Sequence, residues 1–157
     1  MNIEVHPIGT IEADERGMRI AVGEAYRAGL KGLGDYSHVQ VLWWADACAS
    51  DAGRAVLVEQ KPYVNGPDEL GVFATRSPQR PNPLAISSVD IAYVDEEAGA
   101  IGLCYIDAFP GTSVLDLKPY TPSIDRVERP SVPAWCAHWP RSYEESCDFN
   151  WEVEFNF

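Results

Sequence analysis

Apolar and polar residues alternate in short segments along most of this chain, and brief apolar runs stand between turn-forming residues. A period of two and short runs rich in β-branched and aromatic residues are both typical of β-strands. The chain reverses at residues 14–17 and 95–99, where turn formers separate neighbouring apolar segments. On this pattern we predict strands over residues 3–11, 18–22, 38–45, 71–74, 85–94, 100–106 and 113–117.

Fewer segments fit a helix. Residues 24–33 are predicted to form one short helix that ends at Gly32 and Gly34. Residues 51–60 fit a helix or a strand, and residues 61–70 are predicted to be a loop because they contain two prolines and a glycine. The remaining irregular part is rich in proline and tryptophan, and its last residues, 149–157, alternate strictly, which predicts a half-buried final strand.

Many short strands with turn signals every ~8–12 residues favour a β-barrel or a β-sandwich over a doubly wound sheet. No GxGxxG sequence follows a strand, so a Rossmann-type cofactor site is not expected. The length of 157 residues corresponds to one domain, and no linker or repeat interrupts it. We therefore expect a mainly β single domain over 1–157 with few short helices, in which 128–157 is an irregular tail ending in a strand.

The charge balance restricts the possible partners. The chain has 12 Lys and Arg residues against 24 Asp and Glu residues, a net charge of −12. Acidity on this scale promotes solubility, and it disfavours nucleic acid, because a nucleic-acid binder normally presents a basic face. The sequence contains no apolar run of the ~20 residues that cross a bilayer and no signal-peptide pattern, so we expect a cytoplasmic protein without a membrane partner.

The four cysteines contain no CxxC pair. Cys136, His138 and Cys147 could supply three ligands to a zinc ion, but a structural zinc site normally takes four ligands. The alternative is that the cysteines are ordinary half-buried thiols. We expect the second arrangement and no metal.

The loop at residues 75–83, Thr-Arg-Ser-Pro-Gln-Arg-Pro-Asn-Pro, carries the first candidate chemistry. Its three prolines fix the backbone, so little entropy is lost when a ligand binds. Arg76, Arg80 and Asn82 supply donors that suit a small zwitterionic ligand. A rigid turn, or a PxxP segment recognised by another protein, would also explain the composition.

The second candidate is the segment 116–125. Alternation along a strand places Asp116 and Lys118 on the same face, either as a surface ion pair or as a charged pair at the mouth of a pocket. Asp125 follows in a loop. His38 begins an apolar strand and is either a core or capping histidine or a ligand contact.

Both candidate segments resemble one known family. The run from Gly71 to Pro83 and the run Asp-Leu-Lys-Pro-Tyr at 116–120, with Asp125, closely resemble the TsaA-like (YaeB-like) tRNA methyltransferases. The sequences Pro-Ile-Gly at 7–9 and Gly-Asp-Tyr-Ser-His at 34–38 are similar to that family as well. The resemblance implies a β-barrel, commonly a homodimer, that binds S-adenosylmethionine without a Rossmann fold. It also implies N6-methylation of a threonylcarbamoyl-modified adenosine beside the tRNA anticodon.

The resemblance also assigns roles to residues. It places Asp116 and Lys118 at the catalytic centre, where Asp116 would orient or deprotonate the attacking amine, and it places Tyr120 and Asp125 in the substrate pocket. The implied cofactor contacts are His38, Arg76, Ser77, Pro78, Arg80, Pro81 and Asn82. A small molecule or a protein as methyl acceptor, and a non-catalytic S-adenosylmethionine-binding domain, remain as alternatives, the former favoured by the acidity.

Overall fold

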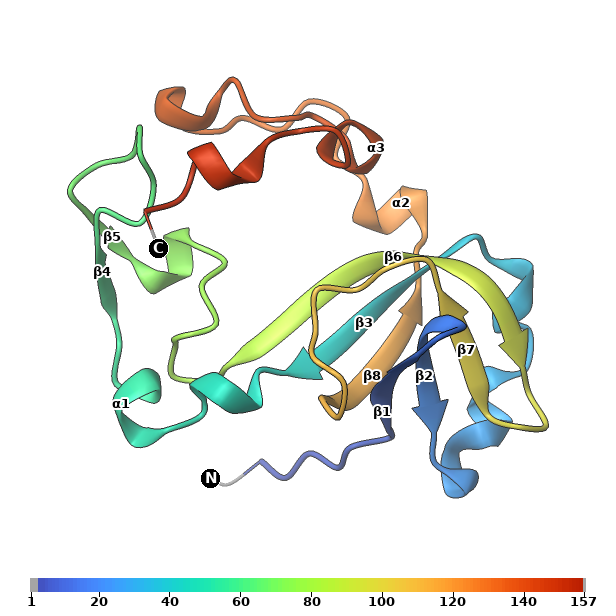
Figure 1. Ribbon diagram of the computed structural model, residues 1–157. Coiled ribbons are helices and arrows are strands. Elements are labelled where there is room, and N and C mark those ends of the chain that lie inside the picture. Colours follow the sequence, from blue (N-terminus) through green and yellow to red (C-terminus); the bar gives the residue numbers. More distant parts are fainter. Residues whose placement is uncertain (1–2, 157) are drawn as a thin grey trace.

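The predicted barrel is present in the computed structural model, which describes residues 3–156 (Figure 1). Six antiparallel strands of the described residues close in the order β1-β2-β7-β6-β3-β8. They are β1 (Gly9–Asp14), β2 (Gly17–Val22), β3 (His38–Trp44), β6 (Leu84–Asp95), β7 (Ala100–Leu103) and β8 (Ser113–Pro119). This arrangement has no Rossmann-type parallel sheet.

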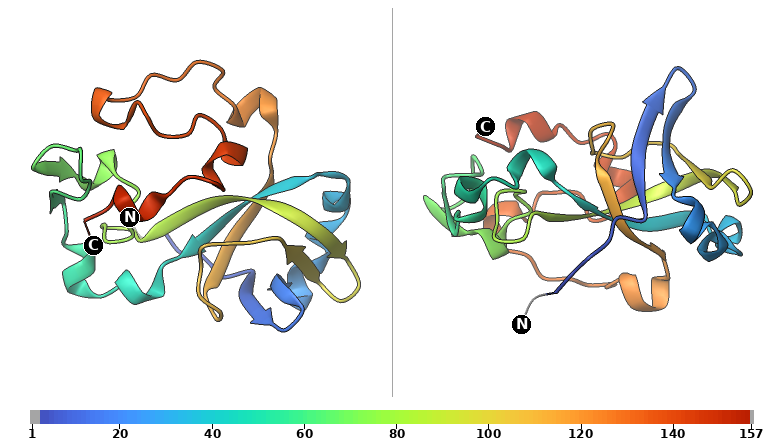
Figure 2. Two further views of the ribbon diagram at one scale, coloured as in Figure 1. Left: turned by 45° about the horizontal axis from the view of Figure 1, so that its top comes forward. Right: turned by 90° about the horizontal axis from the view of Figure 1, so that it is seen from below.

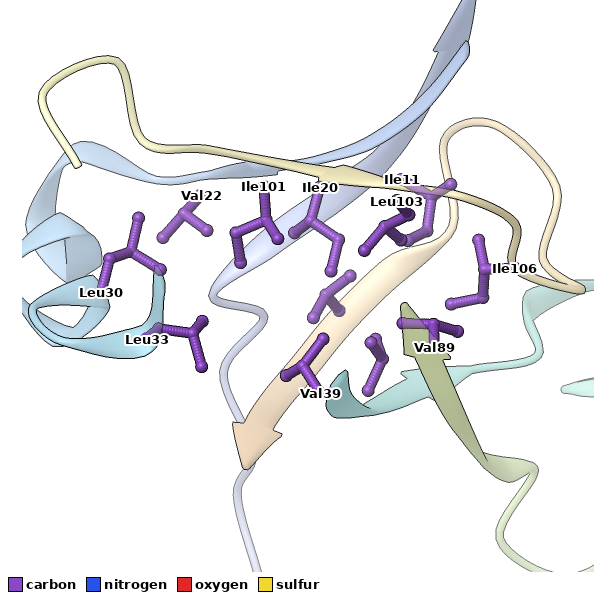
Figure 3. Close-up of a cluster of buried hydrophobic side chains, with 12 residues drawn as sticks. Ile11, Ile20, Val22, Leu30, Leu33, Val39, Val89, Ile101, Leu103 and Ile106 are labelled. Atoms are coloured by element: carbon purple, nitrogen blue, oxygen red, sulfur yellow. The ribbon is translucent and has the colours of Figure 1, made fainter. Parts of the chain in front are cut away.

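The barrel interior is filled by one face of each strand (Figure 3). Because strand side chains point alternately to opposite sides, β3 buries Val39 and Val41 completely and packs Trp43 against the same core, while the residues between them face outward. Ile11, Ile20 and Ile101 are equally buried, on β1, β2 and β7. Each such side chain removes enough apolar surface from water to contribute about 1.5–3 kcal/mol, so the alternation read in the sequence is also the main source of stability.

The barrel is closed by only a short contact between its first and last strands. β1 pairs with β8 at Gly9 and Thr10, and the rest of β8 has no β1 partner. Two 3₁₀ helices, η1 (Glu24–Leu30) and η2 (Leu33–Asp35), cover this side and add Leu30 and Leu33 to the core. The predicted helix over 24–33 is therefore two 3₁₀ segments, separated at Gly32, whose φ of 82° favours glycine.

Several boundaries differ from the prediction. Residues 3–8 are not a strand, since β1 begins at Gly9 and runs to Asp14, and β7 ends at Leu103 rather than at residue 106. The segment 51–60 contains both predicted alternatives, α1 (Asp51–Arg54) and β4 (Val58–Gln60). The predicted strand 71–74 is wrong.

In place of the predicted strand 71–74, β5 (Glu69–Gly71) pairs with β4, and the 3₁₀ helix η4 (Val72–Ala74) follows. A further 3₁₀ helix, η3 (Asp46–Cys48), connects β3 to α1. The β4–β5 sheet stands apart from the barrel at the left of Figure 1. No helix among residues 3–156 is long and apolar enough to cross a membrane.

The tail follows α2 (Pro122–Asp125) and returns toward the β4–β5 sheet (Figures 1 and 2). It contains η5 (Ala134–Cys136), α3 (Tyr143–Ser146) and η6 (Trp151–Val153). The predicted final strand at 149–157 is wrong for the described residues, where η6 stands and only Phe155 forms an isolated bridge, to Tyr63. Residue 157 lies outside the described range.

The alternation of apolar and polar residues in the tail reflects packing between aromatic rings and not strand pairing. Its aromatic rings pack against one another and against Tyr63 of the β4–β5 connection, with ring centroids 4.8–5.9 Å apart. Glu154 between them is buried, and its carboxylate accepts hydrogen bonds from Trp139 Nε1 at 2.9 Å and His138 Nε2 at 2.8 Å. We call these rings the aromatic cluster: Tyr63, Trp135, Trp139, Phe149, Trp151 and Phe155.

Candidate functional site

The predicted site residues border one surface, the outward side of β6, β3 and β8, which we call the outer sheet face. The register pairs Leu42 of β3 with Ile86 of β6 and with Asp116 of β8. The row beside it joins Gln40 to Ser88 and Lys118. The outer sheet face comprises Leu84, Ile86, Ser88, Asp90, His38, Gln40, Leu42, Trp44, Asp116 and Lys118. It changes from apolar at the Leu84 end to polar at the His38 end.

The loop 75–83 lies at the apolar end and is held by its own side chains. The guanidinium of Arg80 donates to the carbonyls of Val72, Thr75 and Ser77 at 2.7–2.8 Å. Thr75 is buried, and its hydroxyl donates to Val72 O at 3.0 Å and accepts from Ser77 N at 3.2 Å. Arg80 therefore braces the loop, which sequence reasoning treated only as a source of ligand donors.

The other loop residues are more open. Arg76 is exposed, and its Nη2 donates to Ile86 O at 2.9 Å, which ties the loop to β6. Pro78 and Asn82 are exposed and Pro81 is half-buried. This arrangement leaves Arg76 and Asn82 as the loop residues whose polar groups are best placed to meet a ligand.

A hollow of about 570 Å³ lies where the loop meets β3 and the N-terminal segment. Asn82, Trp44, Asp46 and Arg54 supply its polar and aromatic lining, and the Arg54 guanidinium lies 5.7 Å from the Trp44 ring centroid. Small-molecule sites commonly occupy about 300–1,000 Å³ and combine apolar walls with a few polar groups. Asp46 and Arg54 were not predicted, because only the fold brings them beside Asn82.

Asp116 and Lys118 form the predicted pair on β8. Lys118 Nζ is 2.7 Å from Asp116 Oδ2, and both side chains are about half exposed. The hydrogen bond to Asp116, with the attraction of its charge, raises the pKa of Lys118, so the ammonium stays protonated. Asp116 also lines a second hollow, of about 540 Å³, with Tyr26 and Tyr36. The ion pair is therefore present, and Asp116, but not Lys118, is among the residues that line this hollow.

His38 lies at the polar end. Its Nε2 is 3.0 Å from Asp90 Oδ1, and its Nδ1 is 2.8 Å from Ser37 Oγ. The ring of Tyr120 lies 6.2 Å from the His38 ring, and Tyr120 N donates to His38 O at 3.1 Å. Asp125 Oδ2 accepts from Thr121 N at 2.6 Å, so this predicted pocket residue stabilises the turn that begins α2.

The structure thus orders the predicted residues along a face and does not gather them at one point. His38 and Trp44 are six residues apart on β3, roughly 20 Å at ~3.3 Å per residue. Tyr120 lies beside His38, Asp116 and Lys118 lie midway, and the loop lies beyond Trp44. The predicted contacts for one small cofactor are therefore distributed over more than one neighbourhood.

The possible zinc ligands do not come together. Cys136 is buried and its Sγ donates to Pro133 O at 3.4 Å, while His138 contacts Glu154. Cys147 is exposed. Within residues 3–156, no group of three His, Cys, Asp or Glu side chains is arranged to hold a metal ion.

Comparison with known proteins gives the family. The model of the tRNA-methyltransferase O N-terminal domain matches residues 3–126. An S-adenosyl-L-methionine-binding protein of Archaeoglobus fulgidus is 36% identical over 110 residues, which are 70% of this chain and 73% of that protein. A probable S-adenosyl-L-methionine-binding protein of Pyrococcus abyssi is 33% identical over 151 residues, covering 96% of this chain and 77% of its own length.

Two further relatives concern tRNA modification. A tRNA (adenine(37)-N6)-methyltransferase of Eikenella corrodens is 41% identical over 91 residues, 57% of this chain and 51% of that enzyme. The crystal structure of TrmO from Pseudomonas aeruginosa superposes with a TM-score of 0.63 at 28% identity, covering 83% of this chain and 62% of that one. This chain thus spans less than two thirds of the solved structure. By the match over residues 3–126, it belongs to the tRNA-methyltransferase O N-terminal domain family.

Proposed function

We propose that this chain is an S-adenosylmethionine-dependent methyltransferase that methylates N6 of an adenosine in tRNA. The observation that carries the proposal is the family match over residues 3–126, which includes the whole loop 75–83 and the Asp116–Lys118 pair. The cofactor is S-adenosylmethionine, since relatives from two archaea are named as binding it. The threonylcarbamoyl-modified adenosine beside the anticodon is the acceptor that the family resemblance favours.

The loop 75–83 and the hollow beside it fit this cofactor. S-adenosylmethionine supplies an activated methyl group on a sulfonium, and it carries a carboxylate, an ammonium and an adenine. The exposed guanidinium of Arg76 suits the carboxylate, and the hollow beside Asn82 offers the Trp44 ring for stacking. Arg80 acts indirectly, because it holds the loop in one conformation before binding.

The acceptor amine is proposed to lie near Asp116. With S-adenosylmethionine bound, the amine nitrogen would gain the methyl group and lose one proton, which Asp116 would accept or pass to solvent water. Asp116 can accept a hydrogen bond from the amine and orient it, while Lys118 holds the carboxylate at 2.7 Å. Positioning of this kind supplies much of the rate in bimolecular transfers.

The acidity of the chain supports a second candidate, an acceptor that is a small molecule or a protein. With a net charge of −12, few cations are available to neutralise tRNA phosphates. The two candidates differ in how salt affects turnover. Binding to tRNA weakens steeply as salt rises, whereas a small neutral acceptor is almost insensitive to it.

The test begins with calorimetric titration of S-adenosylmethionine into the wild-type protein and into Arg76→Ala. We expect binding that Arg76→Ala weakens about tenfold, because a charge-assisted contact to a carboxylate contributes ~1.5–3 kcal/mol. Arg16→Ala, in the exposed β1–β2 turn, is the matched control and should bind like the wild type. Absence of heat and of thermal stabilisation in the wild type would refute the proposed function.

The second arm measures methyl transfer from labelled cofactor to tRNA with and without the threonylcarbamoyl group, across a salt series. We expect labelling only of the modified tRNA, with a steep loss at high salt. Cofactor binding without labelling of either tRNA would reject this acceptor and favour the second candidate. Asp116→Asn should lower turnover while leaving cofactor affinity nearly unchanged.

A further inference from the structure

The tail returns to the outer sheet face, although it follows the residues that match the family. The match ends at residue 126, and α3 of the tail begins at Tyr143. The hydroxyl of Tyr143 donates to Asp90 Oδ2 at 3.1 Å, and its ring packs edge-on against His38 with centroids 5.8 Å apart. In Figure 1 the chain leaves α2 and bends back so that α3 stands beside it. The tail therefore contacts the His38 end of the outer sheet face.

Asp90 connects the two aromatic residues. The β3–β6 register places Asp90 directly opposite His38, and its two carboxylate oxygens have different partners. Oδ1 is 3.0 Å from His38 Nε2, and Oδ2 accepts from Tyr143. With Ser37 Oγ at 2.8 Å from His38 Nδ1, the side chains of Ser37, His38, Asp90 and Tyr143 follow one another at 2.8–3.1 Å, and we call this group the Tyr143 array.

The protonation states of the array follow from its partners. Burial, followed by the hydrogen bond to Asp90, raises the pKa of Tyr143 to about 12, so its hydroxyl keeps its proton and donates. A carboxylate oxygen accepts hydrogen bonds, so the 3.0 Å distance from Asp90 Oδ1 favours an N–H at His38 Nε2. In the Nε2–H tautomer of imidazole, Nδ1 accepts from the Ser37 hydroxyl.

We propose that Asp90 and Tyr143 are positioning residues, which hold the His38 imidazole in one orientation and one tautomer for contact with the cofactor. The tail is then a part of the site. Neither residue is among those that the family resemblance assigned, and Tyr143 lies beyond the family match. The inference rests on the proposed function, and its premise is that His38 is one of the cofactor contacts that the family resemblance implies.

The test combines a spectroscopic measurement on His38 with cofactor titration. Nitrogen NMR of the imidazole should show the Nε2–H tautomer in the wild-type protein without cofactor. Asp90→Asn should produce a mixture of tautomers, and Tyr143→Phe, which keeps the ring but loses the hydroxyl, should give an intermediate spectrum. Both should weaken S-adenosylmethionine binding about tenfold, the usual consequence of losing a hydrogen bond to a charged group.

The matched control is Tyr93→Phe, which removes the hydroxyl of an exposed tyrosine on β6 and should leave spectrum and affinity unchanged. The proposal is overturned if Tyr143→Phe keeps the wild-type spectrum, or if it changes the spectrum without changing cofactor affinity. If the wild-type protein binds no cofactor, the proposed function fails separately. The positioning proposal then depends on the His38 spectrum alone, which Tyr143→Phe must change.

Discussion

The barrel and the tail are held together by different kinds of contact. In the barrel, backbone ladders join six strands, and branched aliphatic side chains fill the interior. In the tail, the described residues form only short helical turns, and the aromatic cluster holds them against the β4–β5 connection. Hydrogen-bonded strand ladders around an aliphatic core therefore stabilise the barrel, whereas contacts between individual residues stabilise the tail.

This difference predicts how much of the molecule is destabilised by a single substitution. A barrel strand pairs with neighbours on both sides, so losing one interior side chain weakens the whole closed sheet. The tail contacts the rest of the molecule at the Tyr143 array and at the β4–β5 connection, where the aromatic cluster is joined by hydrogen bonds from Val64 N to Glu154 O and from Asn156 to the carbonyls of Pro62 and Lys61. Segments with few backbone ladders open locally at lower free energy than the core does.

The largest expected effect is on the barrel. Ile101→Ala removes a fully buried side chain from β7, and we expect the free energy of unfolding to fall by about 2–5 kcal/mol, since a cavity remains. Denaturant unfolding followed by circular dichroism measures it. The control is Ile124→Ala on α2, where the side chain is 80% exposed and the change should stay within about 0.5 kcal/mol. Equal effects of the two substitutions would contradict this account of the core.

Sequence reasoning succeeded where one physical rule dominated. Alternation identified β3 and β6, because each barrel strand buries one face and exposes the other. The same rule failed at residues 149–156, where the spacing of Trp151, Val153 and Phe155 matches a strand. An alternating segment forms a strand only if a sheet edge is available to pair with it, and the sequence does not show where that edge is.

The residues of the candidate site also fall into two groups, those found from local sequence and those that only the fold brings together. The loop 75–83 and the Asp116–Lys118 pair were found from local composition, and the pair has the predicted same-face geometry. Asp90 and Tyr143 were missed, because their relation to His38 depends on the β3–β6 register and on the path of the tail. The bracing role of Arg80 was missed since no pattern in the sequence shows that its donors turn inward.

A smaller effect is expected in the tail. Trp139→Ala removes a ring that packs against Tyr63, Trp135 and Trp151 and a donor to Glu154. We expect the free energy of local tail opening to fall by about 1–3 kcal/mol, less than for a full core site because Trp139 is half-buried. Hydrogen exchange should accelerate in residues 128–156 while the barrel amides keep their protection. Equal acceleration in the barrel would show that both regions unfold as one unit.

The smallest expected effect is the loss of tail stability at acidic pH, through the carboxylate of Glu154. Hydrogen bonds from Trp139 and then from His138 lower the pKa of Glu154 below its usual 4.5. A lowered folded-state pKa stabilises the tail above pH 4.5, and this contribution is lost as pH falls through the folded-state value. Proteolysis of the tail should therefore accelerate below about pH 4.5 in the wild type, relative to the same protein at pH 6.

The comparison with Glu154→Gln isolates this one carboxylate from the other acidic residues. The amide cannot ionise, so the variant should lose the extra acid sensitivity in the tail while the barrel responds to acid as in the wild type. Glu152→Gln, on an exposed neighbour in η6, is the matched control and should retain the wild-type profile. If tail proteolysis depends on pH identically in Glu154→Gln and in the wild type, the Glu154 carboxylate does not stabilise the tail and apolar packing does. The tail would then differ from the barrel in its topology but not in the apolar nature of its contacts.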